Sequence, residues 1–116
     1  MGGMANIHRG EIEAELGGRT WRLCLTLGAL AELEQTLGEP DIMALCQRFE
    51  KGRLSALDAI RIIGSGLRGA GNDLSNDEVA GLTAANGAVT YVAIVAKLLE
   101  ATFMPHGVKQ DVPEGN

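Results

Sequence analysis

The sequence has few of the residues that most often carry enzyme chemistry or bind nucleic acid. Of its 116 residues, two are histidine and two are cysteine, and aromatic residues make up only 3%. So few aromatic rings provide no platform on which single-stranded nucleic acid could stack. Asp and Glu (15) outnumber Lys and Arg (10), and the net charge of -5 also disfavours a phosphate-backbone partner. We therefore expect no nucleic acid among its partners.

Signals for secretion and for membrane insertion are lacking as well. Cys24 and Cys46 do not have C-x-x-C spacing, and no charged segment followed by an apolar stretch opens the chain. This pattern predicts a reduced intracellular protein. The longest stretch without a charge is 79–96, but Asn86-Gly87 divides it. It therefore predicts two helical segments and no membrane span.

The clearest structural pattern is an alternating segment with a glycine pair at its centre. If Gly17 and Gly18 form a two-residue turn, the apolar side chains of both flanking strands fall on one face. These side chains are Ile12, Ala14, Leu16, Trp21, Leu23 and Leu25. A lone hairpin is only marginally stable, so we expect helices to cover its apolar face.

Helical periodicity follows the hairpin. Thr26 and Gly38 are placed to begin and end the first helix, and the second runs from Ile42 to near Gly52. The third follows Ser55 and ends at about residue 67, the fourth runs from Ser75 to Asn86-Gly87, and the fifth spans 88–103. Apolar residues cover most of the circumference of the fifth helix.

The predicted fold class is α+β: an N-terminal two-stranded antiparallel β-hairpin followed by a bundle of four to five short helices. We expect a flexible N-terminus over 1–6 and a single domain over 7–103, with the hairpin in 7–26 and the helices in 27–103. Residues 104–116 contain Pro105, Gly107, Pro113 and Gly115 and lack periodicity, which predicts a disordered tail.

Two local patterns imitate ligand-binding motifs. Residues 64–69 match GxGxxG, but a helix rather than a strand precedes them, so we interpret them as a frayed helix end. Asp73, Ser75 and Asp77 imitate the start of a calcium loop, but the sixth position is Glu78 instead of glycine. Helix capping by Ser75 and Glu78 explains these residues better.

The remaining candidates for chemistry also have structural explanations. His8 and His106 are far apart and have no metal-ligand spacing. The glutamates at 11, 13 and 15 share one strand face, which is typical of a solvated surface more than of a paired-carboxylate site. Trp21 is interpreted as an anchor between the hairpin and the helices. The sequence thus predicts no catalytic residue, no metal, no cofactor and no enzyme activity.

Four short segments resemble a known family. They are residues 6–11 (NIHRGE), 18–19 (GR), 26–34 (TLGALAELE) and 66–71 (GLRGAG). With their order and spacing, the chain from about 4 to 103 resembles the small tail-assembly protein of α-proteobacterial gene transfer agents and related prophages, a family also labelled tail tube protein.

The resemblance implies a non-enzymatic phage tail assembly chaperone that binds the tape-measure protein in the bacterial cytoplasm during tail morphogenesis. The alternative is a structural tail tube component that stays in the virion, and a host-derived regulatory adaptor is a third reading. The implied partners are the tape-measure protein or other tail proteins, with no membrane.

The candidate contact surface is the helix 88–103, because so short a chain has little core in which to bury every side of it. The expected contact residues are Tyr91, Ile94, Leu98 and Phe103. Plain core packing and homo-oligomerisation through the same helix remain open as alternatives.

Overall fold

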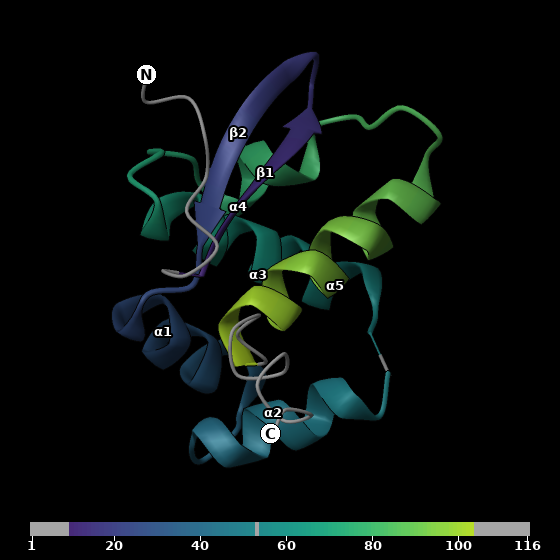
Figure 1. The fold of residues 1–116 in the computed structure, drawn as a ribbon. Coiled ribbons are helices and arrows are strands. Elements are labelled where there is room, and N and C mark those ends of the chain that lie inside the picture. The colour runs from purple at the N-terminus through teal and green to yellow at the C-terminus, as the bar shows by residue number, and fades with distance from the viewer. Residues whose placement is uncertain (1–9, 53, 104–116) are drawn as a thin grey trace, which may run out of the picture.

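The computed structural model describes residues 10–52 and 54–103, which begin with a β-hairpin (Figure 1). Strands β1 (Glu11–Leu16) and β2 (Arg19–Cys24) pair antiparallel, with Ala14 opposite Trp21. Gly17 and Gly18 both have positive φ, at 62° and 78°, as a tight turn that matches the strand twist requires. The predicted register is therefore confirmed. The predicted flexible N-terminus and disordered tail lie outside the described residues.

Five helices follow the hairpin in the described part of the chain, which confirms the predicted α+β class. They are α1 (Leu27–Leu37), α2 (Ile42–Glu50), α3 (Ala56–Gly69), α4 (Asn76–Ala80) and α5 (Ala88–Phe103).

Capping side chains fix where the first four helices begin. Thr26, Asp41, Ser55 and Ser75 each accept a hydrogen bond from the backbone N–H three residues further on. The Ser55 and Ser75 caps are complete capping boxes, in which the acidic residue three positions later accepts the N–H of the serine. Gly38 ends α1 in the left-handed conformation, with φ 73°.

Two helix ends differ from the prediction. The third helix stays regular as far as Gly69, about two residues beyond its expected end. Conversely, α4 stops at Ala80 and does not reach Asn86-Gly87. The N–H groups of Gly81 and Leu82 donate to the carbonyl oxygens of Glu78 and Val79, three residues earlier. This tighter hydrogen-bond pattern ends the α-helix. Leu82 is thereby brought against the core.

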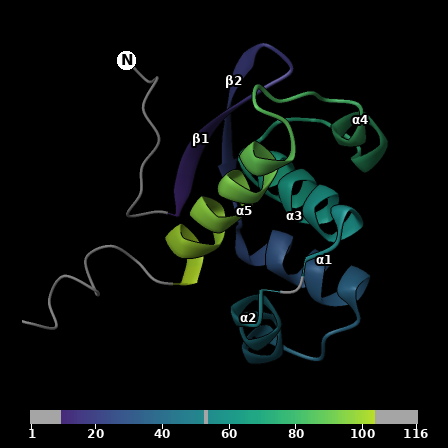
Figure 2. The same cartoon turned by 90° about the vertical axis from the view of Figure 1, so that its right-hand side faces the viewer.

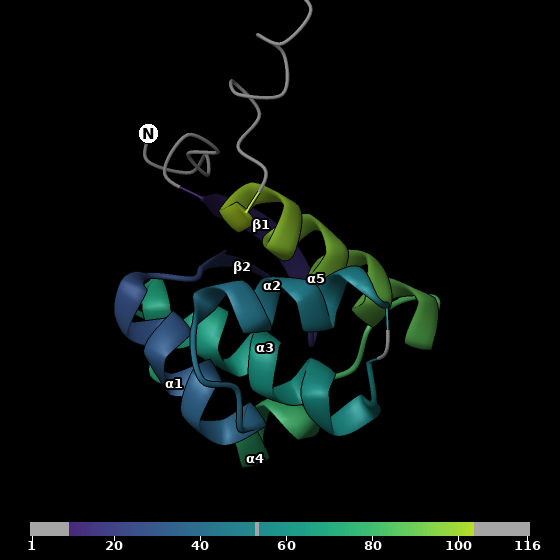
Figure 3. The ribbon, with the colours of Figure 1, turned by 90° about the horizontal axis from the view of Figure 1, so that it is seen from below.

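Helices α3 and α5 together cover the apolar face of the hairpin (Figures 1 and 2). α3 lies centrally and contacts β2, α1, α4 and α5, whereas α5 crosses β1. Seen from below, α2 and α5 lie next to each other on the same side of α3 (Figure 3). The side chains of Leu23, Leu33, Ile62, Leu67 and Leu98 are fully buried where these elements meet.

Trp21 packs against this core from its margin and is only half-buried. Its indole N–H donates to the carbonyl oxygen of Leu16 at 2.9 Å, and the guanidinium of Arg19 lies 4.3 Å from the ring centroid. The Trp21 ring thus joins the two strands next to the turn, and a face of the ring is covered by the Arg19 cation.

Candidate functional site

The four predicted contact residues on α5 occupy two different environments. Ile94 and Leu98 are 5% and 0% exposed and belong to the core. Tyr91 is half-buried, and its hydroxyl donates to the carbonyl oxygen of Leu82 at 2.8 Å. Phe103 is half-buried beside Phe49, with ring centroids 6.4 Å apart. In this arrangement a partner could reach Tyr91 and Phe103 but not the two core residues, and the binding role itself stays a prediction.

A second apolar stripe lies on the flank of α5, and its residues Leu99 and Phe103 still pack against the core. Val92 is 61% exposed, Ala96 is exposed, and Leu99 and Phe103 are half-buried. These four residues recur at i, i+4, i+7 and i+11, so they form one stripe along the helix. Sequence reasoning missed the first three, although the same periodicity could have revealed them. Of this stripe, only Phe103 was among the four predicted contact residues.

The N-terminal half of this stripe borders an apolar cavity of about 400 Å³. Val92 and Val95 contribute one wall, and Leu54 and Ile60, from the start of α3 and the segment before it, contribute another. None of the described residues that line the cavity is charged. Ser55 and Tyr91 are its only described polar side chains that carry a hydroxyl group, and the Tyr91 hydroxyl already donates to Leu82.

The C-terminal half of the stripe borders a second cavity, of about 360 Å³, between α5 and α2. Ala96 and Leu99 line it from α5, and Phe49 lines it from α2. Glu50 and Glu100 place carboxylates at this cavity, and no cation is part of its lining among the described residues. The two cavities thus lie along successive parts of α5, and they share no lining residue.

Cys46 also lines the second cavity, and its thiol is free. Burial raises the pKa of Cys46, and the nearby Glu50 carboxylate raises this pKa further. A thiol of raised pKa is mostly protonated near neutral pH and is a poor nucleophile. We therefore assign it no catalytic role.

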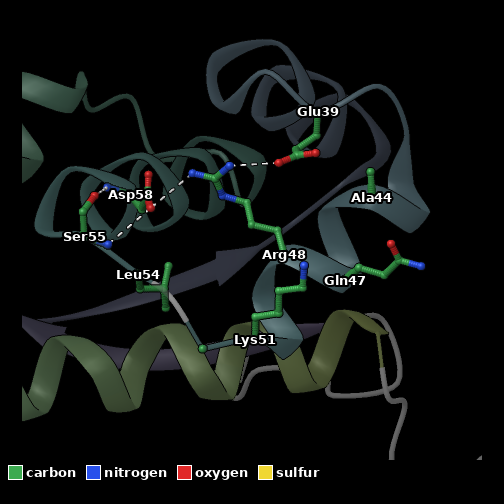
Figure 4. A pocket seen from close by; sticks show the side chains of 9 residues that line it. Glu39, Ala44, Gln47, Arg48, Lys51, Leu54, Ser55 and Asp58 are labelled. Carbon is green, nitrogen blue, oxygen red and sulfur yellow. Dashed lines mark hydrogen bonds and ion pairs between the residues drawn. The ribbon is translucent and has the colours of Figure 1, made fainter.

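A larger, polar cleft of about 800 Å³ lies between α2 and the start of α3 (Figure 4). Arg48 spans it, with nitrogen-to-oxygen distances of 2.9 Å to Glu39 and 3.4 Å to Asp58. The hydrogen bond to Glu39 raises the pKa of the Arg48 guanidinium further above its ordinary range. Asp58 also accepts the N–H of Ser55 at 3.3 Å. Asp58 thus fastens α2 to α3, and Glu39 fastens α2 to the segment that precedes it. Among the described residues, the lining contains no histidine or cysteine to act as a base or nucleophile.

The GxGxxG pattern lies inside α3 and serves close packing. A methyl group on Gly69 would lie 2.1 Å from the carbonyl oxygen of Cys24, and one on Gly66 would lie 2.7 Å from a methyl carbon of Leu98. The interpretation as a frayed helix end is therefore wrong, because the helix is regular through Gly69. The glycines let α3 approach β2 and α5, and no strand leads into them as a dinucleotide site requires.

No group of metal ligands occurs among the described residues. Ser75 and Glu78 cap α4, as expected for the segment that imitates a calcium loop. His8 and His106 lie outside the described residues. Within the described ranges, no helix is long and apolar enough to cross a membrane.

Comparison with known proteins shows a match to a family model. The model described as "Phage tail tube protein, GTA-gp10" matches residues 9–105, which is most of the chain. Neither a curated protein nor a solved structure matches the sequence.

Proposed function

The chain belongs to the phage tail family GTA-gp10, and from that premise we propose that it is a non-enzymatic tail assembly chaperone. In this role it binds the tape-measure protein while the tail is built and leaves before the particle is complete. The observation that carries the proposal is the apolar stripe of α5, in which Val92 and Ala96 stay exposed among the described residues, beside two cavities.

An uncovered apolar surface suits a transient helical client. A long amphipathic helix exposes apolar stripes that aggregate in water, and a partner with a matching apolar groove can cover them. Two cavities of about 400 and 360 Å³ offer a contact of moderate size. Moderate affinity is what a chaperone needs, because tail tube subunits must displace it.

The second candidate is a structural tube subunit, which the description of the family favours. A closed ring built from sheet requires each subunit to pair its strand edges with both neighbours. Only two strands of six residues each occur in the described part of the chain. This small strand content supports the chaperone over the tube subunit.

Co-expression with the neighbouring tape-measure candidate tests the proposal. The chaperone role predicts that the tape-measure candidate becomes soluble, that it co-purifies with this protein, and that mass spectrometry of purified particles does not find this protein. Stoichiometric presence in particles would instead establish the tube subunit or another structural component.

A further inference from the structure

We propose that the outer edge of β1 binds an extended segment of another protein as a third strand of the sheet, in which basic residues alternate with apolar ones. This inference goes beyond the proposed function, because it assigns a second interaction surface, on the side of β1 away from β2. It depends on the backbone groups that this edge presents, on the helix below it and on its charge.

The hairpin turn decides which backbone groups of β1 point outward. The two-glycine turn is closed by Leu16 and Arg19 as a hydrogen-bonded pair. Hydrogen-bonded and non-hydrogen-bonded pairs alternate along an antiparallel ladder, so Glu13 and Glu15 belong to the second kind. Their N–H and C=O groups therefore point away from β2. Each of these two residues offers one donor and one acceptor to a further strand.

The two edges of the hairpin differ in what covers them. On β2, the side-chain amide of Asn72 donates to the outward carbonyl oxygen of Arg22 at 2.8 Å. On β1, the turn end is held, because the N–H of Gly17 donates to the carbonyl oxygen of Thr83 at 2.7 Å. No described group outside the hairpin forms a hydrogen bond with the two outward glutamates. Within the described part of the chain, the edge of β1 is thus open at these two residues.

α5 supports the position that an added strand would take. It crosses β1, and its N-terminal half extends beyond β1 on the side away from β2 (Figures 1 and 2). Thr90, Lys97 and Ala101 recur at i, i+7 and i+11, so they form one stripe of α5. A methyl carbon on Gly10, the residue before β1, would lie 3.6 Å from the carbonyl oxygen of Ala101, which places this stripe next to β1. The inner side chains of an added strand would therefore lie over α5.

Charge decides which strands fit this edge. On the outer face of the sheet, Glu15 is exposed and lies opposite the neutral Thr20. Glu13 lies opposite Arg22, so it selects less strongly. Neither glutamate forms an ion pair with a described residue, and both favour Lys or Arg at neighbouring positions of an added strand. The exposed Lys97 disfavours a cation on the inner face, where apolar side chains fit instead.

A second copy of this chain fits the edge poorly. Every residue of β1 on the outer face is glutamate, so two β1 strands paired along their length would bring glutamates next to one another. This acidic row keeps such edges from pairing with each other and leaves them open to a basic strand.

The first test is an NMR titration of the full chain with a peptide of alternating lysine and valine. Its length of about 20 Å matches the six residues of β1. A matched peptide with glutamate in place of lysine should bind about tenfold more weakly or worse. A lysine-valine peptide with methylated backbone nitrogens should not bind, because it has no N–H to donate. Equal binding of all three peptides, or no binding of the first, would overturn the inference.

Hydrogen exchange of single amides locates the bound peptide. In the free protein the amides of Glu13 and Glu15 should exchange fast, whereas those of Ile12 and Ala14, which point toward β2, should exchange slowly. Bound lysine-valine peptide should slow the two glutamate amides at least about tenfold. Slow exchange of these amides before peptide is added would show that another segment or a second copy already holds the edge, and would overturn the proposal.

Two proline substitutions directly opposite each other provide the matched control. Glu15 and Thr20 face one another across the hairpin and are both exposed. Proline removes the outward N–H at either position and leaves the ladder between the strands intact. Glu15→Pro should weaken binding of the lysine-valine peptide about tenfold, and Thr20→Pro, on the other edge, should retain it. Circular dichroism checks that both variants fold, and equal loss in the two would refute the assignment to β1.

A third variant separates the charge of the edge from its hydrogen bonds. Glu15→Gln keeps the N–H and removes the carboxylate, so it should weaken binding of the lysine-valine peptide about two- to fivefold. Unchanged affinity would contradict the charge argument. In sedimentation, a wild-type dimer that Glu15→Pro converts to monomer would show that a second copy occupies the edge and would overturn the proposal.

Discussion

Replacing Gly69 with alanine should destabilise the fold by about 2 kcal/mol, through a backbone clash that no side-chain movement can relieve. The added methyl carbon would lie 2.1 Å from the carbonyl oxygen of Cys24. Contacts between carbon and a carbonyl oxygen normally lie at about 3.3–3.6 Å, so α3 and the end of β2 must separate by about 1.2 Å. That end of β2 leads directly into the Thr26 cap of α1.

Two effects of opposite sign set the size of this loss. Overpacking a tight contact costs about 1–3 kcal/mol, and more where the backbone must move. Alanine gains up to about 1 kcal/mol over glycine inside a helix, but Gly69 is the last residue of α3, where the gain is smaller. The clash should therefore dominate.

Urea unfolding, followed by the fluorescence of the single tryptophan, Trp21, measures the effect. With a slope of about 2 kcal/mol per molar urea, a loss of about 2 kcal/mol lowers the midpoint by about 1 M. Gly28→Ala is the matched control. Gly28 lies in α1, and the nearest atom that its added methyl group would meet outside the local helix backbone is the Thr26 hydroxyl oxygen, at 3.9 Å. Its free energy of unfolding should stay the same or rise by less than about 1 kcal/mol. A midpoint for Gly69→Ala at or above that of wild type would refute the close-packing explanation.

Three further changes test the caps and contacts that join the helices. Ser75→Ala should lower the free energy of unfolding by about 0.5–2 kcal/mol through loss of the α4 cap, and an unchanged midpoint would contradict that role. Arg68→Ala should cost about 1–3 kcal/mol in thermal or urea unfolding, because its guanidinium joins α1, α3 and the segment before α4. Burial and then Glu50 raise the pKa of Cys46, so Glu50→Gln should lower this pKa and speed alkylation of Cys46 near neutral pH, while Cys24 reacts as before. An unchanged rate at Cys46 would show that Glu50 does not act on the thiol.

The sequence predicted well those parts of the fold that depend on neighbours in the chain. The parity of the strands around Gly17 and Gly18 set the hairpin register, and both capping boxes appeared where Ser55 and Ser75 predicted them. A turn or a cap involves backbone groups only a few residues apart, so the residue types that form it can be recognised within a short segment of the sequence. The early end of α4 was missed, because it depends on how Leu82 packs against distant residues.

The candidate site was less predictable, since apolar residues on nearly every side of α5 hide which side meets the core. Ile94 and Leu98 were named as contact residues with core packing kept open as the alternative, and both lie in the core, whereas Val92 and Ala96 are exposed. Periodicity reveals that a stripe exists, but it does not say whether another element covers that stripe. Phe49 of α2 contacts Phe103 at the C-terminal end of the stripe, whereas Val92 and Ala96 stay exposed.

By itself, the sequence determined the α+β class, the hairpin register, the start of each capped helix and the resemblance to tail proteins. Each of these depends on residue types and spacings within short segments. Only the tertiary structure decided that Gly69 is a contact point with β2, that Arg48 joins Glu39 and Asp58, and which apolar residues of α5 stay exposed. These features depend on distances between segments far apart in the chain, which packing sets and local periodicity does not encode.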